Sequence, residues 1–186
     1  DQDCDGTDFS HDNDGDGTPE IQNIHAITVG NLYISEFMKN PATVADEDGE
    51  WIEIRLNGLG SFDLIGLTIT DSGGDSFTIN EHVVVAANDD YVVLAVNDDT
   101  AINGGVSPDY VYDINDFHLS NAEDEIQVYT GTTLLDEIAY DSGSSWPNPT
   151  GASVSLDNSY ANPNVNDFGS SWCDGQSQYG DGSNLG

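Results

Sequence analysis

The chain has 186 residues, and its 35 acidic side chains outnumber 2 basic ones, which gives a formal net charge of −33 at pH 7. This length suits one globular domain with an appendage rather than two full domains, and so large a negative charge is repelled by phosphate backbones and anionic headgroups, which excludes nucleic acid as a predicted partner. No stretch reaches the roughly 18 apolar residues of a membrane helix, so membrane insertion is not predicted either.

Residues 1–23 carry one acidic pattern twice in succession. Three alternating aspartates are followed by a glycine, and the same pattern begins again at Asp12. Carboxylates at this spacing converge on a hard cation in a tight loop, the glycine permits the sharp turn, and a ligand at the twelfth position closes the shell. The predicted Ca²⁺ ligands are Asp1, Asp3, Asp5, Asp12, Asp14, Asp16, Glu20 and Asn23.

The two predicted loops overlap at Asp12, which closes the first loop and opens the second, so it would bridge two ions. The second loop has the neutral Asn23 at its closing position, which predicts a weaker site or closure by Glu20 instead. The segment resembles thrombospondin type 3 repeats, whose Asp-rich loops wrap successive calcium ions without flanking helices. That resemblance implies a calcium-binding arm, and a solvated acidic spacer is the alternative.

The chain has two cysteines, Cys4 and Cys173, near its opposite ends. Their separation fits no zinc-finger spacing, so a disulfide is predicted rather than a zinc site. Within one chain such a bond would stabilise the fold by roughly 5 kcal/mol in the chain-entropy model. Between subunits it would join a polymer, and both pairings stay open at this point. Cys4 also fits the cysteine-bearing variants of the thrombospondin type 3 repeat.

From residue 24 onward the composition changes to short β-prone runs. The first covers residues 24–29, where Ile24, Ile27 and Val29 are candidates for a strand that pairs within the chain or is donated to a neighbour. Trp51–Leu56 alternates apolar and charged residues, which is typical of a half-buried strand. Further strands are expected within residues 32–37, 62–70, 77–79, 83–86, 91–96, 110–112, 125–129, 134–140 and 152–156.

No window has the apolar spacing of an amphipathic helix, and many short strands separated by turn residues predict an antiparallel β-sandwich. Several runs follow one another in a set order and spacing: residues 32–41, 50–54, 63–67 and 135–140, then Trp146-Pro147 and finally residues 170–172. In this order and spacing the chain is similar to bacterial lamin-tail domains. The resemblance implies an immunoglobulin-like sandwich over residues 31–186, with residues 1–23 as the calcium arm and residues 24–30 as a β-run or linker.

The sequence offers no constellation for catalysis. Its four histidines are scattered, and it has neither a nucleophile elbow nor a phosphate-binding loop, so no enzyme activity is predicted. Trp51 and Trp146 are expected to fill or cap the core, and stacking of carbohydrate on them is the alternative. Glu36 and Glu53 are expected to support loops by accepting backbone hydrogen bonds.

Two functions fit these features, and the resemblance implies a place outside a bacterial cell for both. We expect the first of them, and the second is the alternative. The first is a structural subunit that assembles with itself, as a filament, with the calcium-rigidified arm docked on a neighbour. The second is an accessory module of a larger secreted or cell-surface protein, which the resemblance to lamin-tail domains also implies. There the calcium loops would stiffen a linker and the sandwich would hold a surface, a sugar or a protein partner.

Overall fold

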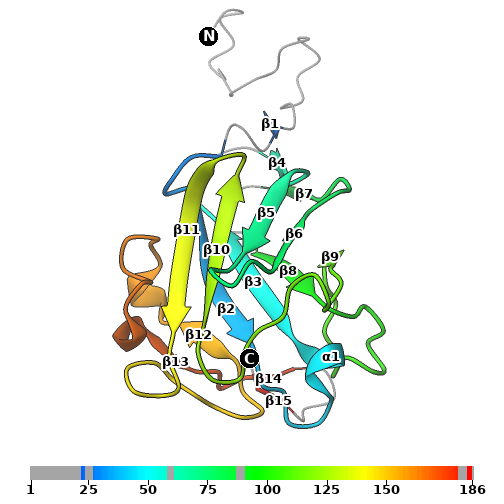
Figure 1. Cartoon of the computed structure of the whole chain (residues 1–186), viewed down its shortest axis with the longest axis vertical. Helices are drawn as coiled ribbons and strands as arrows, with labels where there is room; N and C mark the ends of the chain where they lie inside the picture. Colours follow the sequence, from blue (N-terminus) through cyan, green and yellow to red (C-terminus); the bar gives the residue numbers. More distant parts are fainter. Residues whose placement is uncertain (1–21, 24–26, 58–60, 87–90, 180–183, 186) are drawn as a thin grey trace, which may run out of the picture.

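The protein is a β-sandwich in which a four-stranded sheet packs against a six-stranded one (Figure 1). The computed structural model describes residues 22–23, 27–57, 61–86, 91–179 and 184–185. Its strands are β1 (Gln22–Asn23), β2 (Leu32–Met38), β3 (Trp51–Leu56), β4 (Ser61–Asp63), β5 (Leu67–Thr70), β6 (Ser76–Thr78), β7 (Val84–Ala86), β8 (Tyr91–Ala95), β9 (Tyr110–Val111), β10 (Asp124–Thr130), β11 (Thr133–Tyr140), β12 (Val154–Leu156), β13 (Trp172–Asp174), β14 (Gln178–Tyr179) and β15 (Asn184–Leu185). Three short helical turns complete it: α1 (Asp46–Gly49), η2 (Asn158–Tyr160) and η3 (Gly169–Ser171).

The six-stranded sheet has the order β13-β12-β2-β3-β8-β9, and the four-stranded sheet has the order β11-β10-β5-β6. Two smaller sheets, β1-β4-β7 and β14-β15, accompany them. The pairings are antiparallel except for β8 with β9 and β1 with β4. The predicted all-β, immunoglobulin-like antiparallel sandwich is therefore confirmed.

Side-chain alternation places one face of each long strand in the core. In β3, Ile52, Ile54 and Leu56 are fully buried between the sheets, whereas Glu53 and Arg55 project from the outer face. This matches the alternation in the sequence, because successive side chains of a strand point to opposite faces. The outer face of the six-stranded sheet thus receives the polar residues of its central strands.

A β-bulge interrupts β2, and a buried aspartate of the opposite sheet supports it. The register with β3 shifts between Ile34 and Glu36. The backbone N–H of Ile34 donates to Oδ2 of Asp136 in β11 at 2.7 Å, and the same oxygen accepts a bond from Nδ2 of Asn166 at 2.8 Å. Trp172 Nε1 in turn donates to the Asn166 carbonyl at 2.6 Å. These bonds connect the two sheets with the C-terminal segment.

The C-terminal segment completes both the six-stranded sheet and the core. It supplies β12 and β13, and it buries the rings of Trp146 and Trp172, whose centroids are 5.4 Å apart. Trp172 also meets Phe37 edge to face, with ring centroids 5.7 Å apart. Phe37 stacks on Tyr140 on its other side, at 4.9 Å.

The strand expected over residues 24–29 is not formed in its described part. Ile27 is irregular in backbone and buried in the main core, and Val29 lies in a turn with 60% of its surface exposed. A short strand lies just before it, since Asn23 of β1 pairs with Asp63 of β4. Ile24 lies outside the described residues. Side-chain burial, which anchors Ile27 on its own chain, outweighs the β propensity of the run.

Among the residues that the structure describes, no helix is both long enough and apolar enough to span a lipid bilayer.

Candidate functional site

The predicted calcium ligands lie almost entirely outside the described residues. Asp1, Asp3, Asp5, Asp12, Asp14, Asp16 and Glu20 belong to that part of the chain, and Asn23 is placed in β1. Over residues 27–57, 61–86 and 91–179, no group of three or more His, Cys, Asp or Glu side chains is arranged to hold a metal ion. Calcium binding by residues 1–23 therefore stays a prediction.

Cys173 lies on β13, the edge strand of the six-stranded sheet. It is exposed, and its Sγ lies 3.5 Å from the carbonyl oxygen of Ser155. It forms no disulfide with any described residue, and Cys4 lies outside them. The predicted disulfide is thus neither formed nor excluded.

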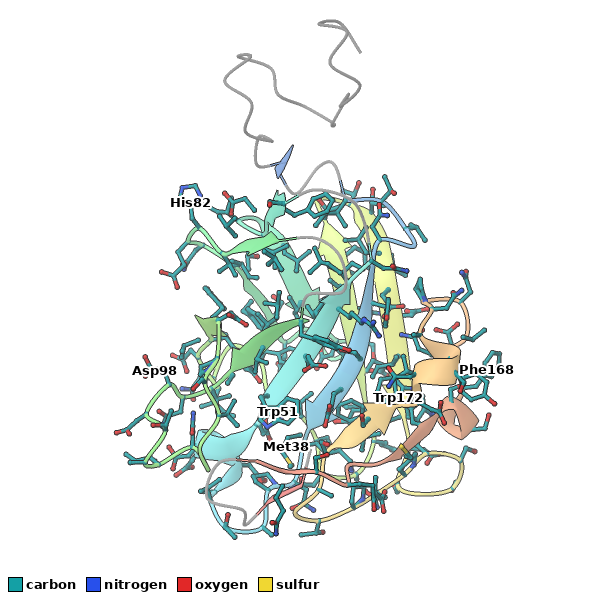
Figure 2. The ribbon with its side chains drawn as sticks, turned by 180° about the vertical axis from the view of Figure 1, so that it is seen from behind. Met38, Trp51, His82, Asp98, Phe168 and Trp172 are labelled. Carbon is teal, nitrogen blue, oxygen red and sulfur yellow. The ribbon has the colours of Figure 1, made fainter. Side chains whose placement is uncertain are left out.

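The two tryptophans considered for sugar stacking are both buried. Trp51 is 6% exposed and packs with Met38 and Ala95 in a small apolar cluster on the outer face of the six-stranded sheet (Figure 2). Trp146 is 7% exposed and packs against Trp172. Trp146 thus fills the core, and Trp51 caps the outer face of the sheet. Stacking of carbohydrate on these rings stays an untested alternative.

A groove with several polar side chains lies on the outer face of the six-stranded sheet. Strand pairing brings its side chains together in two neighbouring rows, because residues directly opposite on adjacent strands share one face. One row is Ser155, Glu36, Glu53 and Val93, from β12, β2, β3 and β8, and the other is Tyr33, Arg55 and Tyr91, from β2, β3 and β8.

Two adjoining cavities form this groove, and Glu36 and Glu53 line both. The first has a volume of about 240 Å³ and is mostly polar, with Arg55 and Tyr91 also in its wall. The second has a volume of about 330 Å³ and is mostly apolar, lined by Trp51, Val93 and Val106 among others. A ligand in the groove would therefore meet the two carboxyl groups between a polar and an apolar half.

Burial in the groove changes the acidity of both glutamates. It raises the pKa of the Glu53 carboxyl to about 7, against the opposing effect of a hydrogen bond from Ser35 Oγ to Oε1 at 2.7 Å. The neighbouring Glu36 raises this pKa further, and the positive charge of Arg55 lowers it. Burial likewise raises the pKa of Glu36, although the hydroxyls of Ser153 and Ser155 favour its ionised form.

Arg55 lies against the ring of Tyr91. Its cross-strand neighbours are Tyr33 on β2 and Tyr91 on β8, and its guanidinium carbon lies 5.1 Å from the centroid of the Tyr91 ring. Oδ1 of Asn158, in η2, lies 3.5 Å from Nη1. The cation–π contact fixes the guanidinium beside the carboxyl pair, so the groove presents hydrogen-bond acceptors and donors side by side.

The sequence indicated part of this site and missed the rest. The outward position of Glu53 and Arg55 follows from the alternation in β3, but the two glutamates accept hydrogen bonds from serine hydroxyls rather than from loop backbone. Ser155 and Asn158 join the site only through the long-range pairing of β12 with β2. No local pattern in the sequence signals that pairing.

A family model described as Lamin Tail Domain matches residues 25–142, which is more than half of the chain. The lamin tail domain is an immunoglobulin-like structural domain rather than a catalytic family. A search of the curated proteins finds no match. The matched region contains Glu36, Glu53, Arg55 and Tyr91 of the groove, whereas Ser155 and Asn158 follow it.

Proposed function

This chain belongs to the lamin tail domain family, and from that membership and the geometry of the groove we propose that it is a non-catalytic binding module of a secreted bacterial protein. The observation that supports this most directly is the groove on the outer face of the six-stranded sheet. It combines partly buried carboxyl groups, a guanidinium and aromatic rings. Such convergent polar groups in a concave site are typical of ligand binding.

Residues 1–23 have a supporting role in this proposal. The two overlapping Asp-rich loops bind Ca²⁺, with Asp12 shared between them, and stiffen the connection that precedes the sandwich. Calcium also offsets part of the net charge of −33. An extracellular location agrees with this use, because weak calcium sites are filled only where calcium is abundant.

A donated strand is less favoured by the structure than a self-complete sandwich. Ile27 is buried in the core of its own chain, and β1 pairs with β4 of the same chain. Donation of residues 24–29 to a neighbour would withdraw Ile27 from that core, which costs about 1.5–3 kcal/mol for a large aliphatic side chain. We therefore place the binding module ahead of the filament subunit.

Self-assembly is the second candidate, and one observation favours it. Cys173 is exposed on β13, which ends the six-stranded sheet. An edge strand with an accessible thiol can pair with a second copy and be joined to it covalently, for example to Cys4 of a neighbouring molecule.

Electron microscopy and analytical ultracentrifugation of the full chain, with Ca²⁺ and after chelation, separate the two functions. The binding module is expected to sediment as a monomer in both conditions, with calcium binding visible by calorimetry and reduced in Asp12→Asn. Calcium-dependent filaments, or a ladder of disulfide-linked species on a non-reducing gel, would overturn this proposal in favour of self-assembly.

A further inference from the structure

We propose that the groove of Glu36, Glu53, Arg55 and Tyr91 binds a neutral saccharide unit, whose hydroxyl groups donate to the two glutamates and accept from the arginine. This inference rests on the proposed function and names the ligand class of its site. It differs from stacking on Trp51 or Trp146, because the bonds to the glutamates and the arginine carry the recognition and both tryptophan rings are largely buried.

The charges in the groove disfavour an anionic ligand. An anion would meet Glu36 and Glu53 at close range and the net charge of −33 at long range. A cation would be attracted by the same charges, but a cationic group cannot accept from the guanidinium of Arg55, which the Tyr91 ring holds in place. A neutral ligand with many hydroxyl groups avoids the repulsion and matches both signs, because each hydroxyl can donate to a carboxylate and accept from a guanidinium.

The two glutamates still have unused capacity to accept hydrogen bonds. Among the described residues, Ser35 donates to Glu53, while Ser153 and Ser155 interact with Glu36. A carboxylate offers about four acceptor sites, so each glutamate can accept further hydrogen bonds from a ligand. Hydroxyl donors from a ligand would form charge-assisted bonds there, which are about twice as strong as neutral ones.

The dimensions and the second half of the groove also suit a sugar. The polar cavity of about 240 Å³ is smaller than the roughly 300–1,000 Å³ of sites for drug-sized molecules, so it admits about one ring. Tyr91 is 47% exposed at its wall and offers an apolar ring surface. Val93 and Val106 line the adjoining apolar cavity, where the C–H face of a second unit would pack.

The test is an array of neutral, acidic and amine-bearing glycans probed with the full chain, followed by calorimetry with the best neutral binder as its methyl glycoside. We expect binding to neutral glycans. Glu53→Gln should weaken it at least tenfold, because an amide has one acceptor oxygen and no charge. Tyr91→Ala should weaken it by a similar factor.

Matched controls separate a loss of binding from a loss of fold. Glu137→Gln changes an exposed glutamate on the four-stranded sheet, and Phe168→Ala removes an aromatic ring that is 61% exposed outside the groove. Both should bind like the wild type. Melting temperature and chemical-shift dispersion of each variant check the fold.

The dependence on pH gives a second readout. The ionised carboxylate is the stronger acceptor, and burial raises the pKa of Glu53 to about 7, so affinity should rise between pH 5.5 and pH 8.5 and this rise should shrink in Glu53→Gln. Preferential binding of charged glycans, absence of binding to every glycan, or equal affinity of Glu53→Gln would overturn the inference. A monomeric, calcium-binding protein that binds no glycan would leave the proposed function standing.

Discussion

Asp136 is the residue on which the connection between the two sheets depends most directly. It is 4% exposed, and its Oδ2 accepts from the backbone N–H of Ile34 and from the Asn166 side chain. Asp136→Ala leaves both buried donors without an acceptor, each at about 1–3 kcal/mol. We expect the free energy of unfolding at pH 6 to fall by about 2–5 kcal/mol in urea denaturation.

Asp136→Asn is the matched control for this prediction. The amide keeps one oxygen at the position that accepts both bonds, so its loss should be clearly smaller than that of the alanine variant. Equal losses in the two variants would contradict the prediction, because asparagine keeps an acceptor oxygen and nearly the full volume of the aspartate side chain.

Glu50 should make the fold less stable as the pH rises. It is 2% exposed, and burial raises the pKa of its carboxyl to about 8, with the nearby Asp46 and Asp124 acting in the same direction. Its ordinary value is 4.5, so the unfolded chain loses this proton first. The contribution of Glu50 to the free energy of unfolding is therefore largest below about pH 4.5 and is lost as the pH rises to about 8.

Glu50→Gln should therefore flatten the dependence of stability on pH. Its amide oxygen can still accept the bond from Leu119 N, which is 2.8 Å long in the native protein. We expect a gain of about 2–4 kcal/mol at pH 8.5 and little change at pH 5, measured by denaturation at both pH values. The exposed Glu81→Gln variant removes the same charge, and curves that run parallel for both variants would contradict the prediction.

Among the secondary-structure elements, η3 packs closely against the backbone of the loop after β11. A Cβ atom added at Gly169 would overlap the carbonyl oxygen of Ser145 and lie 2.9 Å from Cα of Trp146. Because these are backbone atoms, they cannot rotate away. We expect Gly169→Ala to lower the free energy of unfolding by about 1–3 kcal/mol. Denaturation monitored by the fluorescence of the buried tryptophans measures this loss.

Ser170→Ala provides the control for this contact, since it alters the same short helix at an exposed position. It should be within about 0.5 kcal/mol of the wild type. A Gly169→Ala variant as stable as Ser170→Ala would mean that the loop moves aside without cost.

The strands of this fold differ in how far their sequence predicts them. β3 alternates strictly, so its buried and exposed faces follow from the sequence. β2 lacks a regular alternation, because Ser35 and Glu36 are adjacent within an otherwise apolar run, and its bulge depends on Asp136, which is 102 positions away from Ile34 in the chain. Residues 27–29 have β propensity but form a turn, because Ile27 is buried by long-range packing. Local pattern thus predicts strand faces better than register.

The candidate site shows the same limit. The sequence places Glu53 and Arg55 on one face of β3, and Glu36 one strand away. Ser155 lies on β12, which pairs with β2 although the two strands are more than a hundred residues apart in the sequence. Asn158 follows β12 in η2 and completes this wall of the groove. The acidic pattern in residues 1–23 predicted cation binding there, but nothing in the sequence indicated that two glutamates and an arginine converge on the outer face of the six-stranded sheet.

In the whole molecule, the folded sandwich extends beyond the C-terminal end of the family match. The match stops at residue 142, but β12 and β13 extend the six-stranded sheet beyond it, and Asn166 completes the network of Asp136. Four large side chains from this later segment are buried in the main core: Trp146, Val154, Leu156 and Trp172. At about 1.5–3 kcal/mol each, they contribute roughly as much as the 5–15 kcal/mol by which a typical domain is stable.

A fragment of residues 22–142 should therefore fail to fold, although it contains the whole matched region. It would expose the ring of Phe37 and leave β2 with an unpaired edge, so we expect collapsed amide dispersion in NMR spectra and no near-ultraviolet circular dichroism. A fragment of residues 22–186, which lacks the Asp-rich segment but keeps β12 and β13, should give a dispersed, native spectrum. Native spectra from both fragments would contradict the prediction. They would show that the sandwich folds without the C-terminal segment, so that the side chains this segment buries are not required for the core.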